Sequence, residues 1–192
     1  MNSLLLLPFV EIEIRLGTMG KTFDSCIDKK YFQQISNKLE QGNWINVENI
    51  NTNEYINNNL KLINSDKVIM KENVLTKTFQ LNNSPFDIRY SVNQEFLLNS
   101  CIKTFSKENT LIRNKIRKSF ISDFHKYDLT TVIEINNGIS RTKHEIEIEL
   151  LVNEKTLLWT SEYINDFLEC KIYDLINIVE PINREQFKIN IT

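Results

Sequence analysis

The sequence is poor in the residue types on which many common active sites depend. Its 192 residues include four glycines, three cysteines and two histidines. The glycines are scattered singly, which argues against a glycine-rich phosphate-binding loop. Cys26, Cys101 and Cys170 are far apart, and no cysteine or histidine has a partner at metal-ligand spacing. This distribution predicts reduced thiols in an intracellular protein and no zinc site.

The chain also lacks a long hydrophobic run and a strong net charge. The apolar stretch 4–10 is too short to span a membrane and passes directly into Glu11, so we expect no membrane association. The formal net charge is only −2, so any phosphate-binding site must come from a local arrangement of basic residues. With 41% hydrophobic and 25% charged residues, the chain is most simply one domain spanning residues 1–192.

Two stretches alternate strictly between acidic and aliphatic residues, at 10–16 (VEIEIRL) and 144–150 (HEIEIEL). A period of two predicts β-strands whose acidic side chains all point to one face. One such run alone would indicate a sheet with one solvated face. If two runs face each other, each glutamate pair costs about 3 kcal/mol at an effective dielectric constant near 20. A bound divalent cation or converging basic side chains would offset this repulsion.

Two later stretches repeat the alternation with basic residues. Arg113, Lys115 and Arg117 share one face of the run at 111–122, and Arg89 shares a face of the run at 86–96 with Asp87 and Ser91. In the strand that follows the first of these, Asp128, Thr130 and Glu134 share a face. Acidic and basic strand faces are therefore both available to build one charged site.

The remaining pattern predicts two helices and a series of short strands. Helices are expected at 28–41 and 162–178, because apolar residues recur there at the spacing of one helix face. The asparagine-rich segment 43–65 predicts a loop or a short helix. The sequence Asn136-Asn137-Gly138 indicates a tight hairpin turn. The expected strands, which suggest a meander closing into a barrel or sandwich, are 10–16, 67–70, 74–81, 86–96, 101–105, 111–122, 129–136 and 143–152.

If the polar strand faces all point inwards, the result is a barrel with a hydrophilic lumen. Small barrels are ordinarily filled with apolar side chains, so a polar lumen implies a ligand. Basic residues bind phosphate oxygens while carboxylates hold a cation that bridges to them, which suits a triphosphate. Magnesium or manganese is expected rather than zinc, because the candidate ligands are oxygens.

Four motifs in this order resemble those of a known family. They are the opening Glu11-Ile12-Glu13-Ile14-Arg15-Leu16-Gly17, the central Arg113-x-Lys115-x-Arg117, the turn Asp128-Leu129-Thr130 and the late Glu145-x-Glu147-x-Glu149. The chain resembles the metal-dependent RNA 5'-triphosphatases of the fungal and DNA-virus branch of the triphosphate tunnel metalloenzymes. It is most similar to the triphosphatase domain of the mRNA-capping enzymes of giant DNA viruses.

The resemblance implies an α+β fold in which a closed antiparallel eight-stranded β-barrel forms a tunnel with a hydrophilic lumen, flanked by a few helices. It implies a polynucleotide 5'-phosphatase that hydrolyses the γ-phosphate of triphosphate-ended RNA, the first step of mRNA capping, with manganese-dependent hydrolysis of nucleoside triphosphates alongside. Guanylyltransferase and methyltransferase activities would lie on the same polypeptide or in a complex. The expected location is intracellular, in a virion or a cytoplasmic viral factory.

The resemblance also assigns roles to the charged residues. Glu11, Glu13 and Glu149 would hold Mg²⁺ or Mn²⁺. Arg89, Lys115 and Arg117 would bind the phosphates, with Arg113 and Arg15 in support and Asp128 orienting a basic neighbour. The carboxylate that positions the attacking water stays open among Glu145, Glu147 and Glu95.

Two alternatives remain open at this point. The other branch of the tunnel superfamily acts on tripolyphosphate, thiamine triphosphate or, as a cyclase, on ATP, but it opens with a lysine where this chain has Arg15, and the triplet at 145–149 fits it less well. A non-catalytic β-barrel that binds RNA or protein is the alternative from a different class. It predicts that metal is dispensable and that single glutamate-to-alanine changes are mild.

Overall fold

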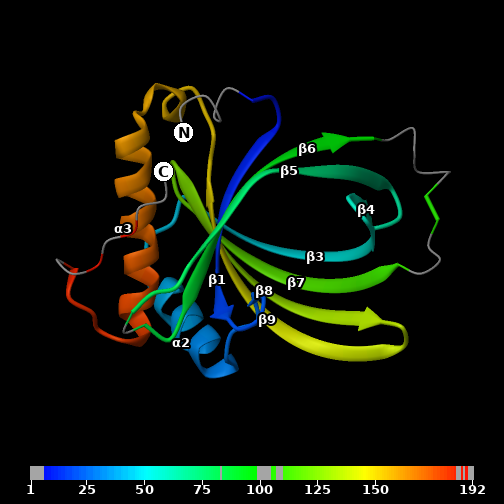
Figure 1. Cartoon of the computed structure of the whole chain (residues 1–192), viewed down its shortest axis with the longest axis horizontal. Coiled ribbons are helices and arrows are strands. Elements are labelled where there is room, and N and C mark those ends of the chain that lie inside the picture. Colours follow the sequence, from blue (N-terminus) through cyan, green and yellow to red (C-terminus); the bar gives the residue numbers. More distant parts are fainter. Residues whose placement is uncertain are drawn as a thin grey trace.

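The computed structural model describes residues 7–82, 84–98, 105–106, 110–184, 187 and 189, and Figure 1 shows their arrangement. No helix in this part of the chain is long and apolar enough to cross a membrane. The elements, in chain order, are β1 (Val10–Met19), β2 (Phe23–Asp24), α2 (Lys29–Leu39), β3 (Asn46–Asn57), β4 (Leu60–Ile63), β5 (Lys67–Phe79), β6 (Asp87–Leu97), β7 (Leu111–Ile121), β8 (His125–Asn136), β9 (Ile139–Leu150), the short 3₁₀ helix η2 (Thr156–Leu158) and α3 (Ser161–Val179).

Within the described residues, eight strands form a closed barrel. Their hydrogen-bonded order is β1-β6-β5-β4-β3-β7-β8-β9, and β9 pairs back to β1. All of these pairings are antiparallel, and β2 adds to the end of β1. The closing pair sets Glu13 opposite Glu149 and Arg15 opposite Glu147. The predicted closed antiparallel β-barrel with flanking helices is therefore confirmed.

β1 and β9 each present one apolar and one polar face, and the apolar face points out of the barrel into the hydrophobic core. On β1, Ile12, Ile14 and Leu16 are fully buried in the hydrophobic core, whereas Glu13 and Arg15 line the tunnel. The core lies between the barrel and the helices α2 and α3, which Figure 1 shows on one side of the barrel. The lumen is consequently left to polar side chains.

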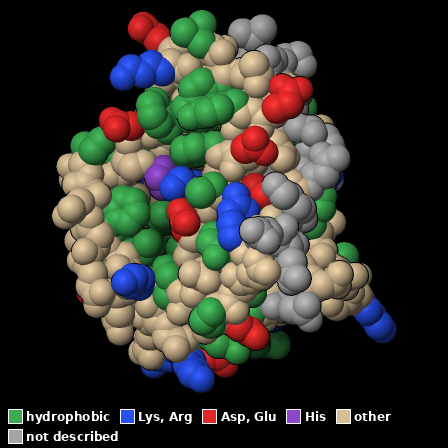
Figure 2. Space-filling view, turned by 90° about the vertical axis from the view of Figure 1, so that its left-hand side faces the viewer, with side chains coloured by type: hydrophobic (Ala, Val, Ile, Leu, Met, Phe, Trp, Pro, Cys, Tyr) green, Lys and Arg blue, Asp and Glu red, His purple; other side chains and the backbone are tan. Residues whose placement is uncertain are grey.

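Both predicted helices are present, and their first turns are capped by side chains. The Asp28 carboxylate accepts a hydrogen bond from the backbone N–H of Lys30, and the Thr160 hydroxyl accepts one from that of Tyr163. Figure 2 faces the side covered by α3, where apolar side chains gather towards the end at which α3 begins. Leu158 in η2 and Tyr163 in the first turn of α3 are exposed there. Cys26 and Cys170 are free thiols, and Cys101 lies outside the described residues.

The prediction of a loop or short helix at 43–65 is wrong, because this segment forms β3 and β4. Asn49, Asn51 and Asn53 lie on the exposed outer face of β3, while Thr52 and Glu54 point into the tunnel. β3 pairs with β7 along nearly its whole length, from Asn46 opposite Ile121 to Ile56 opposite Leu111. Asparagine disfavours strands, but pairing with neighbouring strands overrides local propensity.

Two predicted strands, 67–70 and 74–81, are one strand in the structure. β5 runs continuously, and its pairing with β6 shifts register between Asn73 and Leu75. Such a bulge inserts one residue and breaks the period of two, so the sequence pattern looked like two runs. The predicted strand at 101–105 lies almost entirely outside the described residues. The predicted hairpin turn is confirmed, since Asn137 and Gly138 have φ of 49° and 78° between the paired residues Asn136 and Ile139.

Candidate active site

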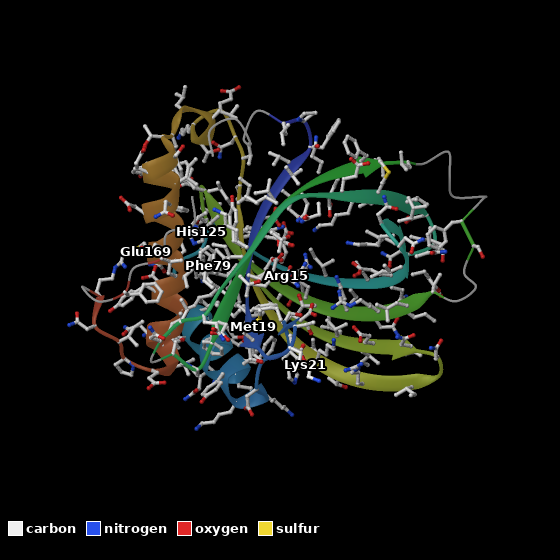
Figure 3. All side chains as sticks on the ribbon, in the orientation of Figure 1. Arg15, Met19, Lys21, Phe79, His125 and Glu169 are labelled. Carbon is white, nitrogen blue, oxygen red and sulfur yellow. The ribbon has the colours of Figure 1, made fainter. Side chains whose placement is uncertain are left out.

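The lumen contains two adjoining cavities that share part of their lining. The larger has a volume of about 490 Å³ and the smaller about 340 Å³. Figure 3 shows Arg15 in the middle of the molecule, where side chains of several strands meet. The residues that line both cavities are Glu13, Arg15, Lys61, Lys71 and Lys115. The tunnel thus has a charged waist at which both cavities meet.

Carboxylates from β1, β6 and β9 gather on one side of this waist. Lys71 from β5 lies among them: its Nζ contacts Glu11 and lies 3.6 Å from Glu13 and 3.4 Å from Glu95. Burial alone would lower the pKa of Lys71, but the charges of Glu13, Glu11 and Glu95 raise it above its ordinary value. The ammonium group therefore stays protonated and offsets the repulsion that the sequence indicated.

Glu149 completes this acidic wall from β9. Burial raises the pKa of its carboxyl to about 7, against the opposing charge of Lys126 at 2.9 Å, and the nearby charge of Glu11 raises it further. Among the described residues, no three Asp, Glu, His or Cys side chains already surround one metal position. The donor set nevertheless fits Mg²⁺ or Mn²⁺, because the register sets Glu13 against Glu149 and the candidate ligands Glu11, Glu13 and Glu149 all offer carboxylate oxygens.

A basic wall of the lumen comes from β7, which β8 separates from β9. Arg113 Nη2 lies 2.6 Å from Glu145, Lys115 Nζ 2.9 Å from Glu54, and Arg117 Nη1 3.0 Å from Asp128. Asp128 also accepts a hydrogen bond of 2.5 Å from the Ser119 hydroxyl, which fixes its carboxylate beside Arg117. Each basic side chain is thus held by a carboxylate of another strand of the barrel.

Lys115 is the most deeply placed of these cations. Its side chain is 7% exposed, and burial lowers the pKa of Lys115 to about 8, although the charge of Glu54 acts in the opposite direction. Arg113 and Lys61 add to the lowering because their charges are of the same sign. Lys115 is therefore a cation whose charge the surroundings tolerate poorly, and an incoming phosphate would relieve that cost.

Arg15 and Glu147 form the central ion pair of the lumen. Arg15 Nε lies 2.9 Å from Glu147 Oε1, and Arg15 Nη2 donates a 3.1 Å hydrogen bond to Glu13. Burial would raise the pKa of Glu147, but Arg15 and Arg117 hold it far below its usual range. Glu147 is consequently a permanent anion that orients two arginines.

Arg89 differs from the other arginines of the lumen. No carboxylate of the described residues lies within ion-pair distance of it, whereas Arg15, Arg113 and Arg117 each have one. The Nε of Arg89, like those of Arg15 and Arg113, is buried without a hydrogen-bond partner. Its guanidinium lies over the Phe23 ring, 4.9 Å from the centroid. Phe23 reaches this place because β2 packs closely on β1: a Cβ on Gly17 would lie 2.2 Å from the Asp24 carbonyl oxygen. The motif glycine thus supports the platform under Arg89.

The structure brings all the predicted site residues to one lumen. The metal candidates Glu11, Glu13 and Glu149, the cations Arg15, Arg89, Arg113, Lys115 and Arg117, and the acids Glu95, Asp128, Glu145 and Glu147 all belong to the network described above.

Sequence reasoning missed Lys71, Glu54 and Lys61. Lys71 fell in the apparent gap between two strands, and Glu54 and Lys61 fell in the segment predicted to be a loop or a short helix. For Glu54 the available signal was the alternation Ile50, Thr52, Glu54 within the asparagine-rich stretch.

Residues 47–184 match the family model described as "mRNA capping enzyme, beta chain". The chain belongs to this family. Comparison with curated protein sequences found no match. The matched segment contains the basic motif of β7, the Asp128 turn and the glutamate triplet of β9, whereas the opening motif of β1 precedes it.

Solved structures resemble the barrel of this capping-enzyme beta-chain member along most of its length. The RNA triphosphatase Pct1 of S. pombe is 17% identical with a TM-score of 0.70, and the match covers 91% of this chain and 88% of Pct1. The Mimivirus capping enzyme triphosphatase is 16% identical with a TM-score of 0.62, covering 93% and 94% of the two chains. These structures show the same fold. Together with the family match, they make this protein an RNA 5'-triphosphatase of mRNA capping.

Proposed function

We propose that this triphosphatase holds Mg²⁺ or Mn²⁺ with Glu11, Glu13 and Glu149 and binds the substrate phosphates with the basic wall of β7. The observation that carries the proposal is that two oppositely charged walls line one lumen, acidic on β1 and β9 and basic on β7. When bound, the cation would neutralise charge on the phosphate oxygens and on the transferring phosphoryl group. The protein's part is to orient the triphosphate between the two walls.

Lys115, Arg117 and Arg89 are proposed to contact the phosphates directly. Arg89 supports this because no carboxylate of the described residues neutralises it. Arg117 has partners in Asp128 and Glu147, but the Glu147 contact is long at 3.4 Å, so its guanidinium can turn towards a stronger anion. Arg15 and Arg113 lie 2.9 and 2.6 Å from their carboxylates. We propose that they support the phosphate-binding residues and do not contact the phosphates first.

Glu95 is the carboxylate that we propose to orient the attacking water. Its side chain is 28% exposed and its ion pair to Lys71 is 3.4 Å long, so it is the least constrained of the three candidates. Glu145 accepts hydrogen bonds from Arg113 and Ser25, and Glu147 is held by Arg15 and Arg117. These two acids are proposed to keep the arginines in place.

The charged side chains of the lumen would contact the triphosphate group, which nucleoside triphosphates share with triphosphate-ended RNA. This supports manganese-dependent hydrolysis of nucleoside triphosphates as a second activity. The product of the RNA reaction is a diphosphate end, which a guanylyltransferase and then a methyltransferase would modify, on the same polypeptide or in a complex. The resemblance to viral enzymes and the likeness to the Mimivirus triphosphatase support a location inside cells, in a virion or a cytoplasmic viral factory.

The test is release of γ-labelled phosphate from triphosphate-ended RNA with magnesium, manganese or a chelator, with ATP and tripolyphosphate assayed in parallel. We expect metal-dependent release from RNA and manganese-dependent release from ATP. Glu95→Gln should lower kcat at unchanged KM, whereas Glu145→Gln should raise KM by releasing Arg113. Full activity in the chelator would contradict the metal assignment, and equal effects of the two variants would contradict the division of roles.

A further inference from the structure

The two cavities of the tunnel differ in charge. Of the described residues that line only the larger cavity, those with charge are Arg89 and Arg113, both cationic. The charged residues that line only the smaller cavity are the four carboxylates of Glu11, Glu54, Glu95 and Glu147 and the two cations Lys67 and Arg117, so the acids are in excess there. A polyanion arriving from solvent is attracted by the first set and repelled by the second.

The basic character of the larger cavity continues onto the β8–β9 hairpin. Arg113 in the cavity lies 3.7 Å from Glu134, and the same carboxylate lies 3.5 Å from Arg141 and 3.4 Å from Lys143. Arg113 is also paired with Glu145, so these three cations share two carboxylates and an excess of positive charge remains on the hairpin. The Arg141 side chain is 64% exposed, so it can contact a ligand that extends out of the tunnel.

We propose that RNA occupies the tunnel in one direction only. The triphosphate reaches the carboxylate-rich cavity through the larger one, and the nucleotides that follow leave along the β8–β9 hairpin, where Arg141 and Lys143 neutralise backbone phosphates. This inference rests on the proposed roles of the two tunnel walls. A nucleic acid fits better than an acidic protein segment, because the trail of cations is continuous with the cavity that receives the RNA triphosphate.

The inference is tested by comparing a long and a short substrate. Arg141→Gln and the double variant Arg141→Gln/Lys143→Gln are assayed on triphosphate-ended RNA and on inorganic tripolyphosphate. For RNA, we expect KM to rise about tenfold in the double variant and the slope of log KM against log salt concentration to fall by about 0.7 per lost contact. KM for tripolyphosphate should not change. Lys30→Gln/Lys38→Gln, which removes two exposed charges from α2, is the matched control.

Two kinetic outcomes would overturn the inference. Equal losses on both substrates would mean that the hairpin acts through Glu134 and Arg113 on the tunnel itself. An RNA effect no larger than that of the α2 control would mean that RNA leaves elsewhere and that the hairpin is free for another partner, such as an acidic protein.

RNA binding measured in a chelator keeps the two proposals apart. If neither substrate is hydrolysed by the unaltered protein, the proposed function fails. The change in RNA affinity of the double variant, measured by fluorescence anisotropy, still decides the exit path: weaker binding than that of the control supports it, and equal binding overturns it.

Discussion

The two faces of β1 alternate residue by residue, yet they are held in different ways. Ile12, Ile14 and Leu16 are fully buried among other apolar side chains, and their contribution depends on shape and area. Glu13 and Arg15 depend on particular partners from β5 and β9. Buried ion pairs contribute little net stability, because desolvation offsets their attraction. The outer face therefore stabilises the barrel, and the inner face keeps charges ready for a substrate.

The largest effect should come from the inner face, at the proposed metal ligands. Glu11→Ala and Glu149→Ala are each expected to lower kcat for RNA about a hundredfold or more, as the loss of one electrostatic group does elsewhere, while the thermal midpoint stays close to that of the parent. Glu72→Ala removes an exposed carboxylate from the outer face of β5 and is the control. Retention of most activity in both variants would disprove the assignment of these ligands.

The outer face should show the opposite behaviour. Ile14→Ala empties a fully buried site and should lower the free energy of unfolding by about 2–5 kcal/mol, measured by urea titration, with kcat per folded molecule retained. Ile116→Ala, at an outer position that is 63% exposed, should cost less than about 0.5 kcal/mol. If Ile14→Ala reduced kcat as strongly as Glu11→Ala, the separation of the two faces would fail.

Gly17 lets β2 pack closely on β1 and so places Phe23 under Arg89 in the lumen. Its substitution should therefore affect both stability and binding. In Gly17→Ala the new Cβ meets the Asp24 carbonyl oxygen and the Phe23 ring, so β2 must shift, at a cost of about 1–3 kcal/mol. Arg89 then loses its platform, and KM for triphosphate RNA should rise. Gly20→Ala, where the nearest atom is 3.9 Å away, should change neither quantity. Similar KM values for the two variants would mean that Phe23 does not position Arg89.

The smallest effect should appear in the pH dependence of binding. Because the pKa of Lys115 is lowered to about 8, its positive charge is lost as the pH rises above that value. KM should therefore increase modestly above pH 8 and level off once Lys115 is neutral.

The weaker substrate binding expected above pH 8 would not result from unfolding caused by deprotonation of Lys115. From about pH 8 to 10.5, the folded chain binds fewer protons at this lysine than the unfolded chain, so this group favours folding as the pH rises. Lys115→Arg, which stays charged, should remove the increase in KM. An unchanged pH profile in that variant would assign the titration to another group.

Sequence reasoning succeeded where one strand face has one kind of chemistry. The glutamates of β1 and β9 and the cations of β7 were assigned to the lumen from alternation alone, and the hairpin at 136–138 and both helices were predicted. It failed for β3, whose outer face is asparagine, and for β5, where a bulge disrupts the alternation. Lys71 and Glu54 were missed for the same reasons, because a residue can be assigned to a lumen only after its strand is recognised.

The sequence by itself determined which side chains share a face, because the alternation of a strand is a local property of the backbone. It did not determine which charges meet. Glu13 lies opposite Glu149 only because β9 returns to close the barrel against β1, and Lys71 lies among the carboxylates because β5 and β6 pair in the register that they adopt. Closure and register depend on contacts between residues far apart in the chain, and only the tertiary structure decided them.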